Sequence, residues 1–489
     1  MILLGIPRPV RRFFAPLRPG LSRPIRNALP VMVLALLLAP HRRCLKTLAG
    51  IVLGRREHAS TISRRLRNAA WRTRDWFVGL YSRCLDDLHD YERRLARRQR
   101  RPRRAWMAVI DTTYHGTHAV QMENLIAPIG RRRRPGGREV RQHAFVMGLL
   151  ITECGMRIPL PRKSYYTQAY CLQHGRRHRT QGQLAADMLR DIRLPDDVEL
   201  TVVFDSAFDA AVVHRICRQR GYRAVFPLDP NRTLSAGPEV EAAGLPGQKV
   251  VHWTRTWSRE EFTPLELQYA NEDHVFLRRR HRDNLRLPKT HRRYAAGARQ
   301  ATVSRLGACL VVASYKENPC VPLVAGQSAD WWDYHRAPVV YQSHGRPVPR
   351  RWQGKVLACT DAAATARQVV EWYEIRWQIE IFFRELKSRM QFGCYVLREF
   401  AAVERYLDLL LMGFLLLERE RLRALRAAGP PRPRGGEPWV QARTTDRLRS
   451  LESLCQGWNA AVLERRMRTE RGRRCLLRDL RAAPPCHVA

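Results

Sequence analysis

Residues 372–390, WYEIRWQIEIFFRELKSRM, place a carboxylate among cations and a phenol at helical spacing. At about 100° per residue, four side chains fall within an arc of roughly 60° on one side of a helix: Tyr373, Arg376, Glu380 and Lys387. A carboxylate beside Arg and Lys stays ionised, as a metal ligand must, and the same cations can bind phosphate. This face therefore predicts a site that acts on phosphodiesters.

The same helix also fits an ordinary amphipathic pattern. The neighbouring arc is apolar and would pack into a core: Ile375, Ile379, Phe382 and Leu386. The polar face would then be solvated, and Glu380 and Arg384 would form a common i, i+4 pair. The helix alone leaves both interpretations open.

Two Asp residues follow apolar runs of strand-forming residues. The run WMAVI at 106–110 leads into Asp111, and VELTVVF at 198–204 leads into Asp205. A buried strand that ends in an Asp can place a metal ligand at the edge of a sheet, although Asp is also a common turn residue. Asp209 competes with Asp205, but it lies one turn into the next predicted helix, where we expect a capping or surface residue.

The region 105–230 has a definite order of predicted elements. Strands are expected at 106–110, 144–151, 156–160, 198–204 and 223–227. Amphipathic helices are expected at 180–192 and 206–220, which gives the order β-β-β-α-β-α-β. This order predicts an α/β fold with a mixed sheet.

The spacing Tyr-x2-Arg-x3-Glu-x6-Lys, with the context IE-x-FFRELK, resembles the signature of a group of bacterial insertion-sequence DDE transposases. The resemblance implies a ribonuclease H-like catalytic core, and the order of elements agrees with that fold. It assigns three acids to catalysis and to metal binding: Asp111, Asp205 and Glu380. It assigns three further side chains to DNA phosphates near the cleaved end: Tyr373, Arg376 and Lys387. The implied cofactor is a pair of Mg²⁺ ions, for which Mn²⁺ would substitute.

The resemblance also implies an activity and partners. We expect Mg²⁺-dependent DNA strand cleavage and strand transfer at insertion-sequence ends, by a cut-and-paste route. The expected partners are double-stranded DNA, namely terminal inverted repeats and target DNA, and a second subunit in a homodimeric synaptic complex. The protein would be cytoplasmic and associated with the bacterial nucleoid, with no membrane partner.

Two other functions compete with this prediction. A transposase-derived protein that no longer cuts could still bind DNA as a repressor or an architectural protein. A basic RNA-binding protein would have no catalytic site, and its three acids would lie far apart. Cleavage of DNA ends separates the first from an active enzyme, and the positions of the acids separate the second.

Charge favours a polyanionic partner. The 489 residues include 87 Lys and Arg against 45 Asp and Glu, a net charge of +42. Most of these cations are Arg, and Ala and Pro are abundant, which is typical of a GC-rich coding sequence. Such a bias explains Arg in place of Lys but does not explain the shortage of acids.

Composition divides the chain into five regions. Residues 1–104, with 25 Lys or Arg and 6 acids, predict a basic helical domain for binding DNA ends. Within it, residues 48–68 fit either a helix-turn-helix or a basic cap packed on the core. The other regions are a first part of the core at 105–230, a β-rich insertion at 231–355, a second part of the core with the Glu helix at 356–427, and a linker with a basic helical tail at 428–489.

The insertion is expected to be rich in short strands and basic loops. Strands are predicted at 249–254, 265–269, 309–313 and 339–341, and basic loops at 278–282 and 289–293. A further basic loop, 131–134, is expected outside the insertion, between the first two strands of the core. Trp331, Trp332 and Trp352 are either stacking surfaces for an unpaired base or buried aromatics. Some relatives hold a flipped base with a Trp that opens the strand before the Glu helix, and the strand predicted here at 355–360 has no Trp. Asp361 is expected to cap the Glu helix, which would begin near Ala364.

Cysteine and apolar patterns suggest neither disulfides nor a membrane span. Twelve Cys are scattered without a Cys-x-x-Cys pair, as expected of reduced thiols. Cys171, His174 and His178 have metal-like spacing but no evident fourth ligand for zinc. The longest apolar run, 30–40, is too short to cross a bilayer, and the second strongly apolar stretch, 403–417, is expected to be a buried helix.

Overall fold

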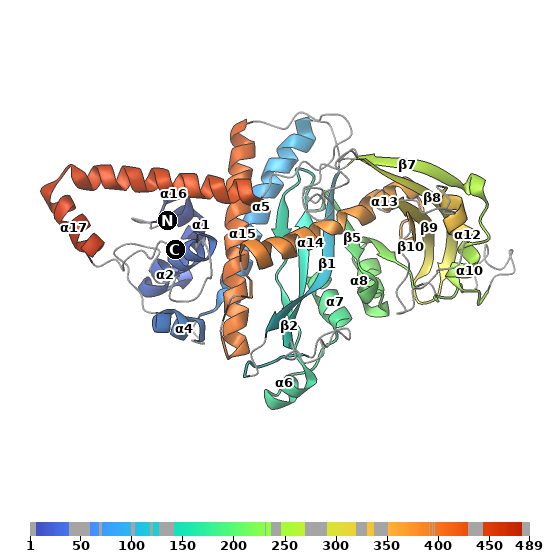
Figure 1. Cartoon of the computed structure of the whole chain (residues 1–489), viewed down its shortest axis with the longest axis horizontal. Coiled ribbons are helices and arrows are strands. Elements are labelled where there is room, and N and C mark those ends of the chain that lie inside the picture. The colour runs from blue at the N-terminus through green and yellow to red at the C-terminus, as the bar shows by residue number, and fades with distance from the viewer. Residues whose placement is uncertain are drawn as a thin grey trace.

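The computed structural model describes residues 6–38, 59–67, 71–98, 103–117, 121–126, 141–229, 231–235, 246–268, 291–318, 330–336, 351–390, 392–393, 395, 397–428 and 444–481. Figure 1 shows an elongated molecule with helices at one end, a sheet in the middle and a β-rich region at the other end. The chain therefore places the predicted N-terminal helical region and the predicted insertion on opposite sides of the central sheet.

One mixed sheet of ten strands runs through the middle and the β-rich end, in the order β3-β2-β1-β5-β6-β10-β9-β8-β7 with β4 paired to β2. Its strands are β1 (Arg104–Thr117), β2 (Arg141–Ile151), β3 (Arg157–Pro159), β4 (Lys163–Ser164), β5 (Val198–Phe204), β6 (Arg223–Pro227), β7 (Phe262–Gln268), β8 (His291–Val303), β9 (Gly307–Glu317) and β10 (Trp352–Cys359). Strands β1, β5 and β6 are parallel to one another, and the other pairings are antiparallel. The mixed α/β class predicted from the order of elements is confirmed.

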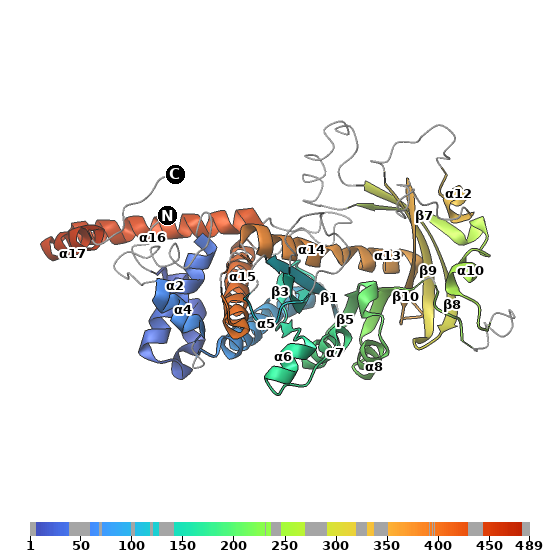
Figure 2. The same cartoon turned by 60° about the horizontal axis from the view of Figure 1, so that its bottom comes forward.

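Helices cover both faces of this sheet. The 3₁₀ turns η1 (Ala15–Gly20), η2 (Ser206–Phe208) and η3 (Arg259–Glu261) accompany α1 (Arg8–Phe14), α2 (Arg23–Leu38), α4 (Ala59–Arg67), α5 (Thr73–Arg98), α6 (Gln168–Gln173), α7 (Gln181–Asp191), α8 (Ala211–Gln219), α10 (Val250–Thr254) and α12 (Trp331–Arg336). The chain continues through α13 (Ala366–Ile375), α14 (Trp377–Arg384), the π-helical η4 (Glu385–Arg389), α15 (Phe400–Ala428), α16 (Thr444–Met467) and α17 (Glu470–Arg481). In Figure 2, α13 and α14 cross one face of the sheet, and α6, α7 and α8 lie on the other.

Long apolar runs explain the central strands. Strand β5 is buried at every position except Glu199, as expected of a parallel strand covered on both faces. Strand β1 differs from the prediction, because it does not end at Asp111 but continues to Thr117. Its pairing with β5 stops at Ile110 and Phe204, whereas its pairing with β2 extends along the later residues. Antiparallel pairing therefore prolongs the strand beyond the end of its parallel neighbour.

Two predicted elements have a different form. The helix expected at 206–220 is split into η2 and α8, because Ala210 is extended between them. The strand expected at 249–254 is the helix α10, which buries Val250 and Trp253 at the i, i+3 spacing of one helical face. In both places a short apolar run fits either period, and tertiary packing decides between them.

The N-terminal helices pack on α15, the strongly apolar helix predicted within 403–417. Helix α15 contacts α2, α4 and α5, and its residues 406–417 are buried. At the centre of this interface Arg162 binds Asp408 at 2.8 and 3.0 Å, and Thr73 of α5 donates a hydrogen bond of 2.8 Å to the same carboxylate. The first half of the helix-turn-helix predicted at 48–68 lies outside the described residues.

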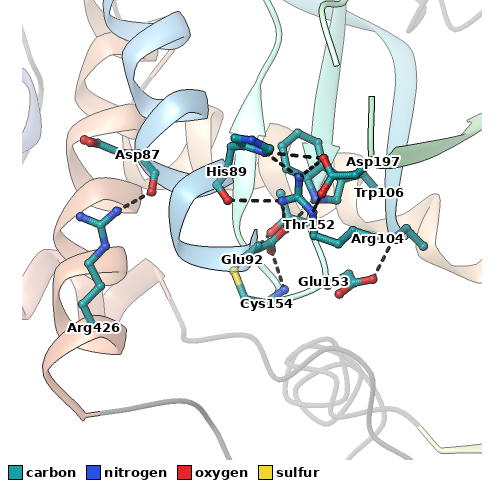
Figure 3. Close-up of polar contacts among 11 residues, drawn as sticks. Asp87, His89, Glu92, Arg104, Trp106, Thr152, Glu153, Cys154, Asp197 and Arg426 are labelled. Carbon is teal, nitrogen blue, oxygen red and sulfur yellow. Dashed lines mark hydrogen bonds and ion pairs between the residues drawn. The ribbon is translucent and has the colours of Figure 1, made fainter. Parts of the chain in front are cut away.

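A second polar cluster fastens α5 to the sheet (Figure 3). The side chain of Arg104 is fully buried and donates to both carboxylate oxygens of Asp197 at 3.0 and 2.8 Å. Buried Glu92 of α5 accepts hydrogen bonds from the Trp106 indole at 2.7 Å and from the Cys154 backbone at 3.0 Å. Buried charges are tolerated only when they are paired and hydrogen-bonded. Because Glu92 belongs to α5 and its partners Arg104 and Trp106 belong to β1, these contacts attach α5 to the start of β1.

The β-rich region continues the central sheet. Strand β10 pairs with β6 on one side and with β9 on the other, and it begins at Trp352, three residues before the strand predicted at 355–360. The Glu helix is therefore preceded by a strand that does open on a Trp. Predicted elements at 131–134, 278–282, 339–341 and most of the linker at 428–438 lie outside the described residues.

The aromatic residues of this region are largely packed. Trp352 is 7% exposed, and Trp331 and Trp332 of α12 are partly buried against Phe262. Of the basic loop predicted at 289–293, Arg293 lies in β8 and forms an ion pair of 2.6 Å with Glu317. Along the described parts of the chain, no helix combines the length and hydropathy needed to cross a membrane.

Candidate active site

The two predicted Asp residues lie where the parallel pairing of two neighbouring strands ends. Ile110 of β1 and Phe204 of β5 are the last residues paired in parallel; Asp111 is the next residue within β1, and Asp205 directly follows β5. Equivalent positions of adjacent parallel strands point to the same face, about 4.8 Å apart. The sheet thus brings residues that are far apart in sequence to one edge.

Backbone N–H groups fix both carboxylates. Asp111 accepts a hydrogen bond of 2.7 Å from the Thr112 backbone, and Asp205 accepts one of 2.9 Å from the Ser206 backbone and caps η2. The next side chain along β1, Thr112, donates to Gln181 of α7 at 3.2 Å. Local hydrogen bonds therefore orient the acids before any ligand binds.

The pKa of the Asp111 carboxyl is raised by its surroundings. Desolvation raises the pKa of Asp111 to about 6, and the nearby carboxylates of Glu380 and Asp205 add to the rise. The Thr112 hydrogen bond and Arg376 act in the opposite direction but do not offset it. Mutual repulsion among three acids, combined with burial, is the condition that a bound cation would relieve.

Glu380 comes from the helical segment that crosses this face of the sheet. The segment begins after Thr365, whose side chain forms a capping box with Gln368, and not after Asp361. Asp361 forms an ion pair of 2.7 Å with Arg223 instead. The correction has a simple cause, since Thr365 immediately precedes the first helical residue and Asp361 does not.

The predicted single helix is interrupted twice. One break between α13 and α14 lies at Arg376, and the turn at Glu385–Arg389 is π-helical. Both irregularities fall on or beside residues of the signature. Breaks of this kind in a helix are frequent at functional sites. The apolar stripe is buried as predicted at Ile379, Phe382 and Leu386, with Ile375 partly buried.

Arg376 lies between two of the acids. Its Nη1 atom is 3.7 Å from Asp111 Oδ2 and 3.6 Å from Glu380 Oε1, and both Arg376 and Asp111 side chains are 15% exposed. These distances are ion pairs but too long for hydrogen bonds, and Nη1 has no hydrogen-bond partner among the described residues. The guanidinium therefore balances the acids without being locked to either.

Lys387 and Tyr373 lie on either side of this centre. Desolvation lowers the pKa of Lys387, although the residue is exposed, and the carboxylates of Glu380 and Asp111 oppose the shift. The Tyr373 ring is buried, and its hydroxyl accepts a hydrogen bond of 2.9 Å from Lys355 of β10. Lys355 is a cation at the site that the sequence analysis missed, because only the fold brings β10 beside α13.

A buried ion pair supports the π-helical turn. The Arg157 guanidinium of β3 donates to both carboxylate oxygens of Glu385 at 3.2 Å, with 2% and 3% of the two side chains exposed. The Arg157 backbone N–H also donates to Glu418 of α15 at 3.0 Å. Spacing alone could not reveal this pair, since the signature context that contains Glu385 says nothing of Arg157, which lies on an edge strand.

A cavity of about 1260 Å³ opens beside Asp205. Its walls carry cations and aromatic rings: Arg232, Arg255, Arg305, Lys355, Tyr315 and Trp352. Asp209, expected to be a capping or surface residue, also lines it but is only 7% exposed, since its carboxylate binds His214 at 2.8 Å and the Arg232 guanidinium. Burial with two partners makes Asp209 structural and leaves Asp205 as the open acid.

The zinc spacing does not form a site. Nδ1 of His174 contacts the Tyr170 carbonyl at 3.0 Å, and Nδ1 of His178 contacts the Tyr166 carbonyl at 3.1 Å. In the parts of the chain that the structure describes, no three His, Cys, Asp or Glu side chains are close enough to enclose a metal ion.

Comparison with known families decides the class of the protein. Residues 168–416, about half of the chain, match a family described as a transposase DDE domain. The chain belongs to the transposase DDE domain family. No curated protein matches it. As a DDE transposase it is an enzyme that binds DNA, and members of this family generally use divalent metal ions.

The donor atoms of the predicted acids suit such an ion, although among the described residues these acids do not form a closed metal-binding group. The match includes Asp205 and Glu380 but begins after Asp111, so the place of Asp111 in this transposase rests on its geometry. Asp111, Asp205 and Glu380 offer only carboxylate oxygens, the donors that hard divalent cations prefer. Desolvation, with a smaller contribution from the neighbouring carboxylates of Glu380 and Asp205, raises the pKa of Asp111, and a bound cation would favour its ionised form.

Proposed function

We propose that this transposase cleaves DNA at the ends of an insertion sequence and joins the 3′ end to target DNA by a cut-and-paste route. The observation that carries the proposal is the position of Arg376 between Asp111 and Glu380, with Asp205 on the adjacent strand. Two acids that share one loosely held cation, with a third acid after the adjacent strand, suit a site that exchanges its counter-charge for a metal and a phosphate. The Tyr-Arg-Glu-Lys signature group and a ribonuclease H-like core are part of this proposal, supported by the strand order β3-β2-β1-β5-β6.

Asp111, Asp205 and Glu380 would hold two Mg²⁺ ions, for which Mn²⁺ would substitute. When bound, the ions would activate the attacking hydroxyl and stabilise the leaving oxygen of an in-line displacement. The protein's own contribution would be to place the three carboxylates on neighbouring elements, with Arg376 beside two of them. The hydrogen bonds to Asp111 and Asp205 from the next backbone N–H keep these two side chains oriented.

Arg376 and Lys387 would bind the scissile phosphate and its neighbours. Arg376 is free to turn from the acids toward a phosphate because its contacts to them are longer than hydrogen bonds. Tyr373 would act through its contact with Lys355, which lines the cavity beside Asp205. The cavity wall formed by Trp352 makes it the Trp best placed to meet an unpaired base at this site.

The remaining regions would bind the rest of the complex. The basic helices of 1–104 would recognise terminal inverted repeats, and a homodimer would pair two ends at the nucleoid. Attachment of α5 to β1 through the Arg104 cluster would keep this end-binding region in a fixed position relative to the active site. The β-rich region 231–355 would cover the DNA beside Asp205.

The test is cleavage of a labelled duplex carrying the element's own terminus. With Mg²⁺ the wild-type protein should nick this duplex and not a scrambled one, and Asp205→Ala should remove at least about 10³-fold of the rate, since metal ions stabilise the transition state by several kcal/mol. Asp196→Ala, a change at an exposed acid that does not line the cavity, is the matched control and should retain cleavage. Binding of ends by the wild type without nicking would instead identify a DNA-binding protein that does not cut.

A further inference from the structure

A second, smaller hollow lies next to the cavity beside Asp205. It has a volume of about 490 Å³ and is lined by Ala211, Arg215, Arg218, Gln219 and Arg305. Arg305 lines both hollows, so the two are neighbours. The smaller one is lined mainly by residues of α8.

The arginines are placed by two different elements. Arg215 and Arg218 are three residues apart on α8 and share its outer face, because Val213, Ile216 and Cys217 turn inward. Arg305 occupies the turn between β8 and β9, and α8 lies beside these strands in Figures 1 and 2. A Cβ atom added to Gly307 would lie 3.7 Å from Arg218 Nη1, so the turn closely approaches α8.

The hollow concentrates positive charge without compensation. No acid lines it, and none of the three exposed guanidinium groups makes a hydrogen bond or an ion pair with the described residues. Arginines elsewhere in the sheet region behave differently, since Arg223 and Arg232 are each paired with an Asp. Three like charges gathered around one hollow repel one another unless an anion lies between them.

The backbone at Arg305 adds a second, independent observation. Its φ angle is 67°, in the left-handed region that favours Gly or Asn. Two residues later in the same turn, Gly307 has a φ of 85°, and Gly adopts such angles without steric strain. Position 305 has the same kind of backbone angle but carries an Arg. An Arg held at such an angle is explained if its side chain has a function.

We infer that the Arg215, Arg218 and Arg305 hollow binds backbone phosphates of DNA that passes from the active site over α8. The inference rests on the proposed function, because it takes the DNA held at Asp205 as the source of those phosphates. Arg is suited to the task, since its planar fork donates two parallel hydrogen bonds to a phosphate. Contacts of this type add affinity without reading sequence, so they would serve any DNA that leaves the site.

The test measures binding of an end-containing duplex at several salt concentrations, with Ca²⁺ in place of Mg²⁺. Each phosphate contact contributes about 0.9 to the slope of log K against log salt, so the double variant R215A/R218A should lower that slope by about 2. The control R177A/R193A removes the same charge from two exposed arginines outside the hollow and should leave the slope unchanged. An equal change in both variants, or in neither, would overturn the inference.

The variant Arg305→Gly supplies a second test, because its effects on melting temperature and on duplex affinity should differ. Glycine adopts a φ of 67° without strain, so the variant should melt at the same temperature as the wild type or higher, yet bind the duplex more weakly. Unchanged binding by Arg305→Gly would count against the hollow even if the double variant failed to fold. Inorganic phosphate and a single-stranded RNA of equal length are tested in the same binding assay. If either of them binds the wild type more tightly than R215A/R218A while the duplex binds both equally, the hollow holds a free anion or RNA, and the inference is refuted.

The outcome is separable from that of the proposed function. Cleavage by the wild type in Mg²⁺ tests the active site, whereas the salt slope in Ca²⁺ tests the hollow. A wild type that cuts, with salt slopes that the double variant does not change, would retain the active site and reject the hollow.

Discussion

Two clusters of acids around one Arg differ in how tightly they are closed. Arg162 makes hydrogen bonds of 2.8 and 3.0 Å to Asp408 and one of 3.1 Å to Glu404. Arg376 approaches Asp111 and Glu380 only to 3.7 and 3.6 Å. The first cluster is saturated by its own side chains, and the second leaves its charges available to something else.

The pKa shifts of the acids show which interactions act in each cluster. Desolvation would raise the pKa of Glu404, but Arg162, Ser164 and Tyr166 together lower it. Asp408 keeps a raised pKa, because desolvation of this fully buried carboxyl outweighs its bonds. At the active site, desolvation raises the pKa of Asp111 and two neighbouring carboxylates add to the rise. Similar residue types therefore stabilise the fold in one place and store unbalanced charge in the other.

The largest expected effect tests the difference in stability. Arg162→Met leaves buried Asp408 and Glu404 without their counter-charge, and should lower the free energy of unfolding by about 3–5 kcal/mol. Arg376→Met lies in a looser cluster and should lower it by less than about 1 kcal/mol. Urea unfolding of both variants measures the contrast, and similar losses in the two would show that the clusters are not different in kind.

A second prediction concerns pH in the absence of metal. Because the pKa of Asp111 is raised from 3.8 to about 6, the folded state binds its proton more tightly than the unfolded state does. The wild type should therefore lose stability as pH rises from about 4 to above 6, by about 3 kcal/mol at 1.36 kcal/mol per pKa unit. Asp111→Asn removes this loss.

The quantity to measure is the difference in unfolding free energy between wild type and Asp111→Asn, at pH 4 to 7 in EDTA. Taking the difference cancels the titration of other groups. Addition of Mg²⁺ at pH 7 should stabilise the wild type and not the variant. A difference that stays constant with pH would show that Asp111 is not strained by its neighbours.

The smallest expected effect concerns the buried ion pair between Arg157 and Glu385, which supports the π-helical turn of the active-site helix. Replacing Arg157 and Glu385 together by Met and Leu should leave stability nearly unchanged, since apolar side chains of similar volume often substitute for a buried ion pair. Cleavage of the end-containing duplex should fall by about tenfold, or about 1.4 kcal/mol, because the pair positions the turn that carries Lys387.

Binding of the duplex distinguishes positioning from general damage. The double variant should bind the duplex more weakly in Ca²⁺ and keep the wild-type Mg²⁺ requirement for cleavage, because the turn carries Lys387 and none of the proposed metal ligands. Full activity of the double variant would show that the π-helical turn does not need its buried pair.

Much of the site could be predicted from local sequence. The runs before Asp111 and Asp205 are apolar and rich in strand-forming residues, which predicts the strands β1 and β5, whereas their pairing was expected only from the family resemblance. The apolar stripe of the Glu helix is likewise visible in its spacing. Strand and helix periods are properties of neighbouring residues, so the sequence carries them directly.

Errors arose where a short segment fitted two structures. Residues 249–254 satisfy a strand pattern, but packing of Val250 and Trp253 makes them a helix. The Glu helix was predicted as one element, and no local pattern announced its breaks at Arg376 and at Glu385. Such breaks depend on what each turn contacts across the fold.

The sequence by itself determined the chemistry available to this protein: three acids after or within periodic segments, a Tyr-Arg-Glu-Lys spacing and a large excess of cations. Only the tertiary structure decided which charges meet, placing Arg376 between two acids and gathering Arg305 with Arg215 and Arg218. The reason is that periodicity acts over a few residues, whereas the energy of a charge depends on its neighbours in space and on how far they exclude water.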